Sequence, residues 1–303
     1  MDFWQGKTVC VTGGVGSFGR AFTRYLLKTD VRQVRVLDHS EDQRVKMRRA
    51  FNDPRLRFLG GTVRELERLR LAFDGVDVVI HAAALKHVPE GEEEPSEFVL
   101  TNCMGSLNVA RAALDCNVER VVGLSTDKAS ASATLYGATK YVMEKTFIAF
   151  NAYRGNRRTS YTVTRYGNVL GSAGSLIPLL LEQSKTGCVT LTHPDMTRYV
   201  MSMSEALALV NRAAQCAPGL TLIPDLPAAR VVDIIEAVAP ECAVDIIGIR
   251  GAEKLAECLI SDDEAPVVWQ WRSLDGVTDY CLGIRLGPNA PLGISGRHAS
   301  DNR

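Results

Sequence analysis

Short apolar runs alternate with helix-period stretches through the first half of the chain. The runs are dense in Val, Ile and Leu without polar alternation, which is typical of strands in a parallel sheet covered on both faces. The predicted strands are Thr8–Thr12, Gln33–Asp38, Leu56–Leu59, Val76–Ile80 and Val118–Leu124. The predicted helices are Arg20–Thr29, Glu41–Phe51, Glu65–Phe73 and Glu97–Cys116. This alternation predicts an α/β fold with a doubly wound parallel sheet and right-handed crossovers.

The pattern loosens after about residue 170. Helical stretches at Ser175–Thr186, Ser204–Ala217 and Arg230–Ala239 are separated by apolar runs at Cys188–Leu191, Leu220–Ile223 and Asp245–Ile249. We therefore expect a first domain over residues 1–170. Residues 171–286 are expected to form a smaller lobe, interleaved with the first domain, that closes over the carboxyl edge of the sheet. Residues 287–303 are rich in Gly, Pro, Ser and Asn, which predicts a loop or flexible tail.

Composition narrows the class of protein. The 303 residues are 46% hydrophobic and 23% charged, which excludes disordered and fibrous classes. With 35 basic and 35 acidic residues, nothing in the charge favours nucleic acid or an anionic membrane as a partner. No run approaches the ~20 apolar residues of a membrane span, and no secretory signal is visible. The 8 cysteines are scattered without a CxxC pair, so we expect no metal site and reduced thiols in the cytoplasm.

A glycine-rich turn joins the first predicted strand to the first helix. Gly13, Gly16 and Gly19 there allow a tight turn and a close approach of the backbone to a pyrophosphate, next to a helix N-terminus. Alone, this pattern could be only a turn. Asp38, at the end of the second strand, lies about 20 residues further on, as in the dinucleotide fingerprint of the Rossmann fold.

Asp38 bears on the choice of cofactor. Its carboxylate can accept hydrogen bonds from the adenine-ribose hydroxyls and would repel a 2′-phosphate, which favours NAD over NADP. Four basic residues follow closely and could place a positive charge near that site, although a solvated helix face is the simpler interpretation. They are Arg44, Lys46, Arg48 and Arg49.

Four titratable residues follow the fifth predicted strand. Asp127 and Lys128 leave the strand, and Tyr136 and Lys140 share one face of the next helix. A lysine beside a phenol favours the phenolate, so Tyr136 could act as a base well below its ordinary pKa of ~10. The same lysine could hold the nicotinamide ribose. Such a pair can also be a plain surface pair, but its place in a dinucleotide-binding fold argues for function.

Taken together, the motifs resemble the extended short-chain dehydrogenase/reductase superfamily. More closely, the chain looks like the UDP-N-acetylglucosamine 4,6-dehydratases of pseudaminic-acid and capsule-glycan type, in their short soluble form, from about residue 5 to 266. The motifs that carry the resemblance are His81–Pro89, Leu124–Ala129, Tyr136–Lys140, Arg165–Ser172, Asp195–Tyr199 and Gly248–Arg250, with Phe51–Phe58 and Ile260–Ala265 also similar.

The resemblance implies a lyase that borrows and returns a hydride. Tyr136 takes the 4-hydroxyl proton, neutral Lys128 removes the carbon-5 proton, and protonated Asp127 protonates the departing 6-hydroxyl. Inversion at carbon 5 or release of a 5,6-alkene remains open. Lys128 would need a lowered pKa, which burial and the charge of Lys140 would favour. Both groups reach the sugar only if the chain bends after Thr126, and the pair could instead be a surface ion pair.

The resemblance also assigns binding residues. Asn102 is similar to the Asn that positions the catalytic lysine through water, whereas His81 and His87 are expected to be packing residues. Catalytic residues are Thr126, Asp127, Lys128, Tyr136 and Lys140. Cofactor-binding residues are Thr12, Gly13, Gly16, Ser17, Phe18, Gly19, Asp38, His39, Ser40, Thr62, Val63, Ala82, Ala83, Ala84, Lys86, Asn102, Tyr136 and Lys140. Substrate-binding residues, for a UDP-sugar, are Lys86, Thr126, Asn168, Arg198, Arg250 and Glu253.

Some positions depart from the family pattern. Thr62 stands where a carboxylate usually bonds the adenine amine, so it would do so only weakly. The acidic run Glu90–Glu94 is expected to be a solvated helix cap. By analogy with the superfamily, we expect a homodimer or a higher homo-oligomer, with Leu107–Cys116 and Tyr141–Phe150 as contact faces.

Two rival functions remain. A 4-epimerase has small residues where this chain has Asp127 and Lys128. A non-catalytic dinucleotide-binding sensor or scaffold has no need of a tyrosine base such as Tyr136.

Overall fold

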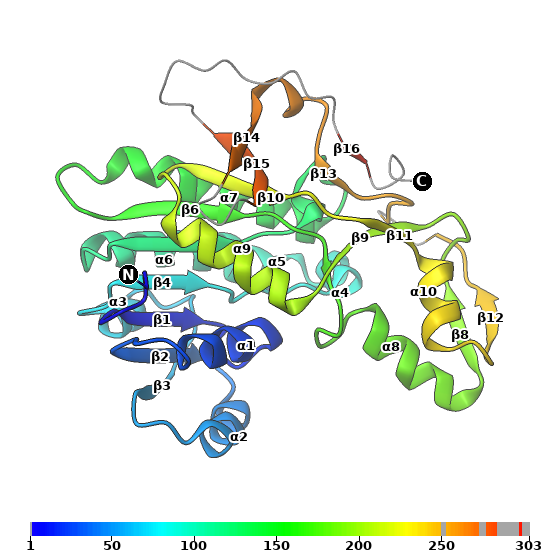
Figure 1. The fold of residues 1–303 in the computed structure, drawn as a ribbon, viewed down its shortest axis with the longest axis horizontal. Coiled ribbons are helices and arrows are strands. Elements are labelled where there is room, and N and C mark those ends of the chain that lie inside the picture. The colour runs from blue at the N-terminus through cyan, green and yellow to red at the C-terminus, as the bar shows by residue number, and fades with distance from the viewer. Residues whose placement is uncertain (1, 250–252, 273–276, 284–296, 299–303) are drawn as a thin grey trace.

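A nine-stranded sheet runs through the molecule in the computed structural model, which describes residues 2–249, 253–272, 277–283 and 297–298 (Figure 1). The strand order is β3-β2-β1-β4-β5-β6-β10-β15-β14, and the strands from β3 to β10 are parallel. These are β1 (Thr8–Thr12), β2 (Gln33–Asp38), β3 (Leu56–Gly60), β4 (Val78–His81), β5 (Arg120–Leu124), β6 (Ser160–Thr164) and β10 (Leu220–Pro224). The antiparallel edge is formed by β15 (Thr278–Gly283) and β14 (Val268–Arg272).

Helices cover both faces of this sheet. One apolar cluster contains residues of α1 (Ser17–Leu26), α2 (Glu41–Phe51) and α9 (Met203–Gln215), and in Figure 1 α1 and α9 lie on the same side of the sheet. A second cluster, on the other face, contains residues of α3 (Leu66–Phe73), α6 (Gly105–Asp115) and α7 (Leu135–Tyr153). The buried strands therefore lack polar alternation because neither face meets water.

A smaller apolar cluster lies to one side of the sheet. It is built from α8 (Leu176–Gln183), β8 (Cys188–Leu191) and α10 (Val231–Val238), and β8 pairs in parallel with β12 (Ala243–Ile246). A three-stranded sheet of β7 (Asn168–Val169), β9 (Thr197–Met201) and β11 (Ala228–Arg230) connects the parts. The remaining elements are α4 (Val88–Glu93), α5 (Pro95–Phe98), β13 (Cys258–Ile260), β16 (Arg297–His298), a π-helix Val99–Met104 and short 3-10 turns at Asp127–Ala129, Ser184–Thr186 and Ala265–Val267.

The predicted α/β fold is confirmed, and six of the parallel strands follow the order 3-2-1-4-5-6, starting from the β3 edge of the sheet. The predicted single helix Glu97–Cys116 is wrong in detail, because a π-helical segment interrupts it between α5 and α6. The run Leu220–Ile223, expected in the smaller lobe, lies in β10 beside β6 in the large sheet. Within the expected tail, residues 297 and 298 form β16, which pairs with β13.

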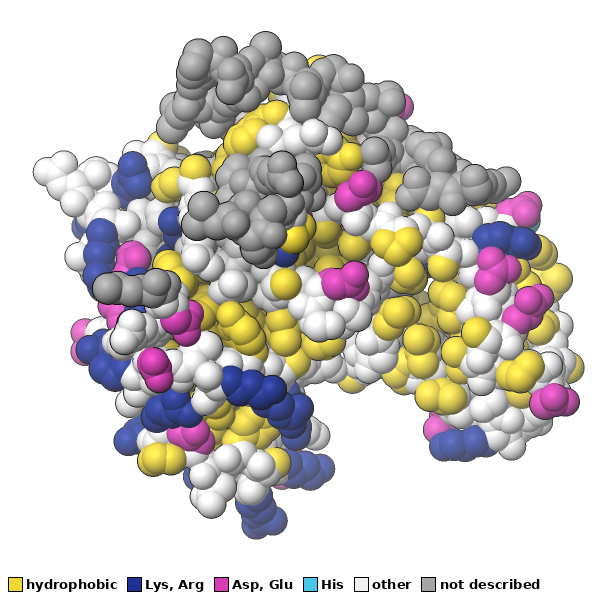
Figure 2. All heavy atoms as spheres, in the orientation of Figure 1, with side chains coloured by type: hydrophobic (Ala, Val, Ile, Leu, Met, Phe, Trp, Pro, Cys, Tyr) yellow, Lys and Arg dark blue, Asp and Glu magenta, His cyan; other side chains and the backbone are white. Residues whose placement is uncertain are grey.

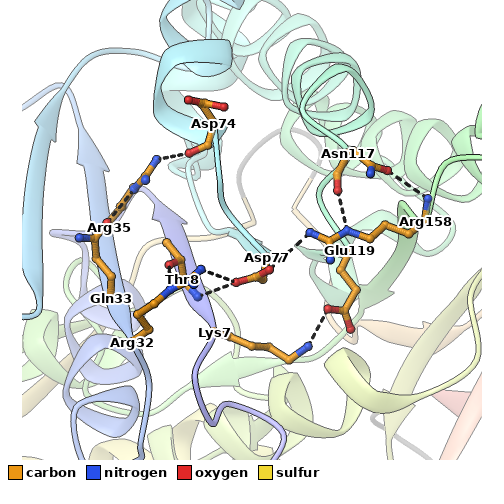
Figure 3. A network of polar contacts seen from close by, with 10 residues as sticks. All are labelled: Lys7, Thr8, Arg32, Gln33, Arg35, Asp74, Asp77, Asn117, Glu119 and Arg158. Atoms are coloured by element: carbon orange, nitrogen blue, oxygen red, sulfur yellow. Dashed lines mark hydrogen bonds and ion pairs between the residues drawn. The ribbon is translucent and has the colours of Figure 1, made fainter.

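A charged network ties the amino ends of the parallel strands together, at the edge opposite the predicted site (Figure 3). Asp77, just before β4, accepts hydrogen bonds from the backbone N–H of Thr8 at 2.8 Å and from the guanidinium of Arg32 at 3.2 Å. Arg158 reaches the other oxygen of Asp77 at 3.4 Å, and Lys7 pairs with Glu119 at 2.7 Å. One carboxylate thus links the starts of several strands.

Candidate active site

The glycine-rich loop between β1 and α1 leaves room for an anion. Gly13 has φ +64°, and a Cβ there would lie 2.7 Å from the backbone of Ala83. A Cβ at Gly19 would lie 2.6 Å from the carbonyl oxygen of Gly13. The backbone N–H groups of Ser17 and Phe18 have no acceptor among the described residues, as expected at a helix N-terminus. The loop therefore fits a dinucleotide pyrophosphate.

Asp38 is positioned at the end of β2 by the backbone. Its carboxylate accepts hydrogen bonds from the N–H of Ser40 at 3.0 Å and of Val15 at 3.3 Å, and His39 Nδ1 lies 3.5 Å away. Arg44 donates to the carbonyl oxygen of Asp38 at 2.6 Å. Arg44 therefore places a positive charge next to Asp38.

The other three basic residues of this helix behave differently from Arg44. Lys46, Arg48 and Arg49 are exposed, and Figure 2 shows basic side chains gathered over α2. The guanidinium of Arg48 covers the ring of Phe58, 5.3 Å from its centroid. These three fit the solvated-face interpretation, whereas Arg44 does not.

Other predicted cofactor residues gather around the same carboxyl edge. Ala82 and Ala83 follow β4 and donate to the carbonyl and hydroxyl oxygens of Thr12, at 3.1 and 3.4 Å. Ser17 accepts a hydrogen bond from the N–H of Ala173 at 2.9 Å, and Lys86 donates to the carbonyl of the same residue. The loop at residue 173 thus ties the phosphate loop to Lys86.

Thr62 and Val63, which were predicted to lie at the adenine, follow β3. The hydroxyl of Thr62 accepts a hydrogen bond from the N–H of Arg64 at 3.3 Å, and Val63 is buried. Ala84 is half-buried after β4. Position 62 therefore presents a hydroxyl where the family pattern has a carboxylate.

The chain bends directly after Thr126, as the predicted roles of Asp127 and Lys128 require. Asp127–Ala129 forms a 3-10 turn, and the hydroxyl of Thr126 caps it by accepting from the N–H of Lys128 at 3.4 Å. The same hydroxyl donates to Oδ1 of Asp127 at 2.9 Å. Asp127 is fully buried, and its Oδ2 has no hydrogen-bond partner among the described residues. The pair is not a surface ion pair.

Lys128 lies between two carboxylates. Its Nζ is 3.2 Å from Oδ1 of Asp127 and 3.2 Å from Oε1 of Glu257. Burial lowers the pKa of Lys128, but the two carboxylates outweigh burial and the net pKa is raised. The predicted lowered pKa is therefore wrong for the protein without substrate. The physical reason is Glu257, a residue that the sequence analysis did not single out.

Tyr136 and Lys140 lie on α7, beside this turn. Burial raises the pKa of Tyr136 to about 12; the charge of Lys128 opposes this shift, Asp127 adds to it, and a hydrogen bond with Thr126 opposes it. Burial also lowers the pKa of Lys140 to about 8, with Glu144 opposing. Lys140 was predicted to stabilise the phenolate of Tyr136. The positive charge that acts on the pKa of Tyr136 is instead that of Lys128.

Asn102 lies in the π-helical segment and is buried. Its amide exchanges two hydrogen bonds with the backbone of Leu85, each 2.9 Å, and donates to the hydroxyl of Thr139 at 3.0 Å. It therefore fixes the loop after β4, next to Lys86, and the residue before Lys140. His81 is buried between the hydroxyls of Thr12 and Ser106, and burial lowers its pKa to about 3, which fits a packing histidine.

A cavity of about 580 Å³ opens onto Lys128. This volume is within the range of small-molecule sites. Of the predicted site residues, Lys128, Arg198 and Glu253 line it, whereas Tyr136, Lys140 and Asn168 do not. Residues that the sequence analysis did not assign to the site complete its wall: Val88, Pro89, Glu92, Glu93, Ala133, Thr134, Lys254 and Glu257.

The acidic run before α5 is not only a solvated cap. Glu92 and Glu93 line the cavity, and Glu92 accepts a hydrogen bond from the N–H of Leu135 at 2.8 Å, at the start of α7. Two residues of this run therefore line the cavity, whereas a purely solvated cap would not contact it.

The residues predicted to bind the nucleotide differ in their contacts with the rest of the protein. Arg198, in β9, donates to the carbonyl oxygens of Thr197 at 2.8 Å and Leu255 at 3.0 Å, and its other terminal nitrogen lies 3.8 Å from Glu253. Asn168 is half-buried in β7. Arg250 lies outside the described residues.

A buried arginine holds the C-terminal segment against the turn Asp127–Ala129, which is called the catalytic turn below after its predicted role. Arg165, fully buried, contacts Glu144 of α7 at 2.6 Å and Glu264 at 2.7 Å. Ser130, directly after the turn, donates to Glu264 at 3.2 Å. The segment that carries Glu257 is thereby fixed to α7 and to the turn.

The chain belongs to the polysaccharide biosynthesis protein family, whose model matches residues 9–273; it is a family of extended short-chain dehydrogenases/reductases. No helix among the described residues has the length and apolarity that a membrane crossing requires.

Similar proteins carry several names. The chain is 44% identical to an uncharacterized membrane protein of Methanocaldococcus jannaschii, over 87% of this chain and 83% of that one. It is 39% identical to a UDP-N-acetylglucosamine 4,6-dehydratase (inverting) of Campylobacter jejuni (88% and 81%), and 40% identical to a UDP-glucose 4-epimerase of Rickettsia conorii (85% and 79%). The X-ray structure of Pen from Bacillus thuringiensis superposes with TM-score 0.93 at 30% identity, over 99% and 94% of the two chains.

Proposed function

We propose that this protein is an NAD(P)-dependent nucleotide-sugar 4,6-dehydratase that acts on UDP-N-acetylglucosamine or a close relative. The observation that carries the proposal is the acid–base pair after β5. Asp127 is fully buried, Lys128 lies on the cavity wall, and their charged atoms are 3.2 Å apart. An epimerase needs one base for the 4-hydroxyl, whereas removal of water also needs a base for carbon 5 and an acid for the 6-hydroxyl.

The loop Gly13–Gly19 and the edge at Asp38 would hold a dinucleotide. A bound nicotinamide supplies a hydride acceptor that later returns the hydride to the sugar. The carboxylate of Asp38 favours NAD, since its negative charge opposes a 2′-phosphate. Arg44, bonded to the carbonyl of Asp38, supports NADP as the alternative.

The residues of this chain divide the proton transfers between them. Tyr136 takes the 4-hydroxyl proton once its pKa falls from about 12, which a further positive charge beside the phenol would cause. The resulting 4-ketone acidifies the carbon-5 proton, which the Lys128 amine removes. Asp127, in its protonated form, delivers a proton to the departing 6-hydroxyl. Lys128 can become neutral by passing its proton across 3.2 Å to Asp127, which prepares base and acid in one step.

Arg198 and Glu253 fit the nucleotide side of the cavity. A guanidinium suits diphosphate oxygens, and Arg198 is already oriented by two carbonyl oxygens. The Oε2 atom of Glu253 is buried without a partner among the described residues, so it could accept hydrogen bonds from ribose hydroxyls.

The experiment is incubation with UDP-N-acetylglucosamine, followed by mass spectrometry and NMR of the product. We expect the loss of one water and a 4-keto-6-deoxy sugar, or a 5,6-alkene. A 4-epimerase, which the similarity to a named epimerase supports, would give a product of unchanged mass. Tight dinucleotide binding without turnover across several nucleotide sugars would instead indicate a sensor or scaffold.

A homodimer is proposed through α7 and the neighbouring π-helical segment. Leu100, Met104, Tyr141 and Val142 are large apolar residues that are 38–47% exposed there. Light scattering at micromolar concentration should give twice the chain mass, and a monomer would reject this interface.

We further infer a cytoplasmic location, in line with the 8 free cysteines of the chain.

A further inference from the structure

Glu257 contacts Lys128 from a distant part of the chain. It comes directly before β13, and its Oε1 is as close to the lysine Nζ as Asp127 is, at 3.2 Å. Glu257 is 4% exposed, and its Oε2 is buried without a hydrogen-bond partner among the described residues. A buried carboxylate with so few partners is costly, so the ion pair with Lys128 is what compensates for its burial.

The position of Glu257 is set by the backbone and not by Lys128. Thr197, at the start of β9, donates its N–H to the carbonyl of Leu255 at 2.9 Å and forms a bridge with Ala256. On the other side Lys254 donates to the carbonyl of Ser130 at 3.3 Å. The carboxylate is therefore presented to the catalytic turn by a fixed segment.

We propose that Glu257 is a positioning residue of the dehydration: its carboxylate holds the Lys128 amine at the cavity and strengthens it as the base for the carbon-5 proton. This inference rests on the proposed function. When Lys128 passes its proton to Asp127, an N–H bond breaks and an O–H bond forms, and the Glu257 carboxylate stays ionised beside the neutral amine. When the amine then takes the carbon-5 proton, the same carboxylate stabilises the ammonium that forms.

Other titratable and charged groups also act on Lys128. Asp127 is on its own turn, Arg198 comes from β9 and the phenol of Tyr136 from α7. Glu92 and Glu93 of α4, together with Lys254 and Glu253, line the same cavity. Among these, Asp127 and Glu257 are the carboxylates in ion-pair contact, and Arg198 opposes them.

The test compares Glu257→Gln with Glu253→Gln. Both remove one carboxylate from the same segment and cavity, but Glu253 lies 3.8 Å from Arg198 rather than on Lys128. The first readout is competitive acylation of the Lys128 amine across a pH series, followed by mass spectrometry of the protein without substrate. The second readout is the pH–rate profile of water loss, with kcat and KM separated.

Removing a carboxylate at ion-pair distance should lower the labelling midpoint of Lys128 by about 1–3 pH units. In Glu257→Gln the corresponding limb of the rate profile should move in the same direction, and kcat should fall about tenfold because a weaker base reacts more slowly. KM should change little. Glu253→Gln should raise KM and leave both midpoints in place.

Glu257→Asp keeps the charge on a shorter side chain, so its labelling midpoint should lie between those of Glu257→Gln and the wild type. If Glu257→Gln does not fold, Glu257→Asp is measured in its place. A midpoint that stays in place in Glu257→Gln, or that moves equally in Glu253→Gln, would overturn the positioning role. The labelling readout needs no turnover. Absence of water loss in the wild type would reject the proposed function, and the labelling midpoints would still decide whether Glu257 sets the basicity of the Lys128 amine.

Discussion

Gly137 tests the packing that places the catalytic turn. It is the third residue of α7 and lies against the turn that carries Lys128. A Cβ on Gly137 would lie 2.0 Å from the carbonyl oxygen of Lys128 and 2.5 Å from the hydroxyl of Ser132. Unstrained carbon contacts lie at roughly 3.5–4.0 Å, so Gly137→Ala must push the turn and the helix apart by more than about 1 Å.

Gly137→Ala should lower the unfolding free energy, which is the opposite of what Gly→Ala usually does inside a helix. Replacing Gly by Ala inside a helix normally stabilises a protein by about 0.5–1 kcal/mol. Here overpacking should reverse this and cost about 1–3 kcal/mol of unfolding free energy. Because the displaced carbonyl belongs to Lys128, turnover should fall about 100-fold, the usual effect of a 1 Å misplacement of a catalytic group.

The assay is thermal unfolding together with initial rates of water loss. Ala138→Ser is the matched control, since Ala138 is the next residue of α7 and is exposed; its unfolding free energy should stay within about 0.5 kcal/mol of the wild type. If Gly137→Ala were more stable than the wild type and fully active, α7 could not rest on the catalytic turn in the way described.

Three further outcomes follow from buried or networked charges. Lys140→Met should abolish turnover yet stabilise the fold by up to about 3 kcal/mol at neutral pH, because the folded pKa of Lys140 is lowered to about 8. That penalty is present below pH 8 and is relieved as the pH rises toward 10.5, so chemical denaturation across this range should show a rise in wild-type stability that the variant lacks. Asp77→Ala should cost about 1–3 kcal/mol by leaving the N–H of Thr8 unsatisfied, with turnover unchanged at the opposite sheet edge; altered turnover would link the two edges. Arg165→Met leaves the carboxylates of Glu144 and Glu264 buried without their cation, so it should cost about 3–5 kcal/mol, and a wild-type melting temperature would exclude the buried network.

Local sequence patterns predicted the bounds of those elements that neighbouring residues determine. The bounds of β1, β2 and α2 match their apolar runs and helix period because neighbouring residues determine those elements. The π-helical segment around Asn102 was missed because apolar periodicity does not report a change in backbone hydrogen bonding. The place of β10 in the large sheet depends on pairing with β6, which no local pattern encodes.

The candidate site also combines features that neighbouring residues determine with one that depends on a distant residue. The shared helix face of Tyr136 and Lys140 could be predicted, and the bend after Thr126 was recognised as a requirement. The protonation of Lys128 could not be predicted. Its second carboxylate, Glu257, is far away in sequence, and the only local signal was a charged residue directly before a short apolar strand. A lowered pKa of Lys128 was predicted from burial and from the charge of Lys140, whereas two carboxylates at 3.2 Å outweigh burial.

The central claim is that the Lys128 amine removes a proton from the sugar, and Lys128→Arg tests it most directly. Arginine can keep the ion pairs with Asp127 and Glu257, but its guanidinium does not lose a proton in proteins. With UDP-N-acetylglucosamine, product mass spectrometry should show the loss of one water for the wild type and none for a folded, substrate-binding Lys128→Arg variant. Loss of water by that variant at the wild-type rate would contradict the account.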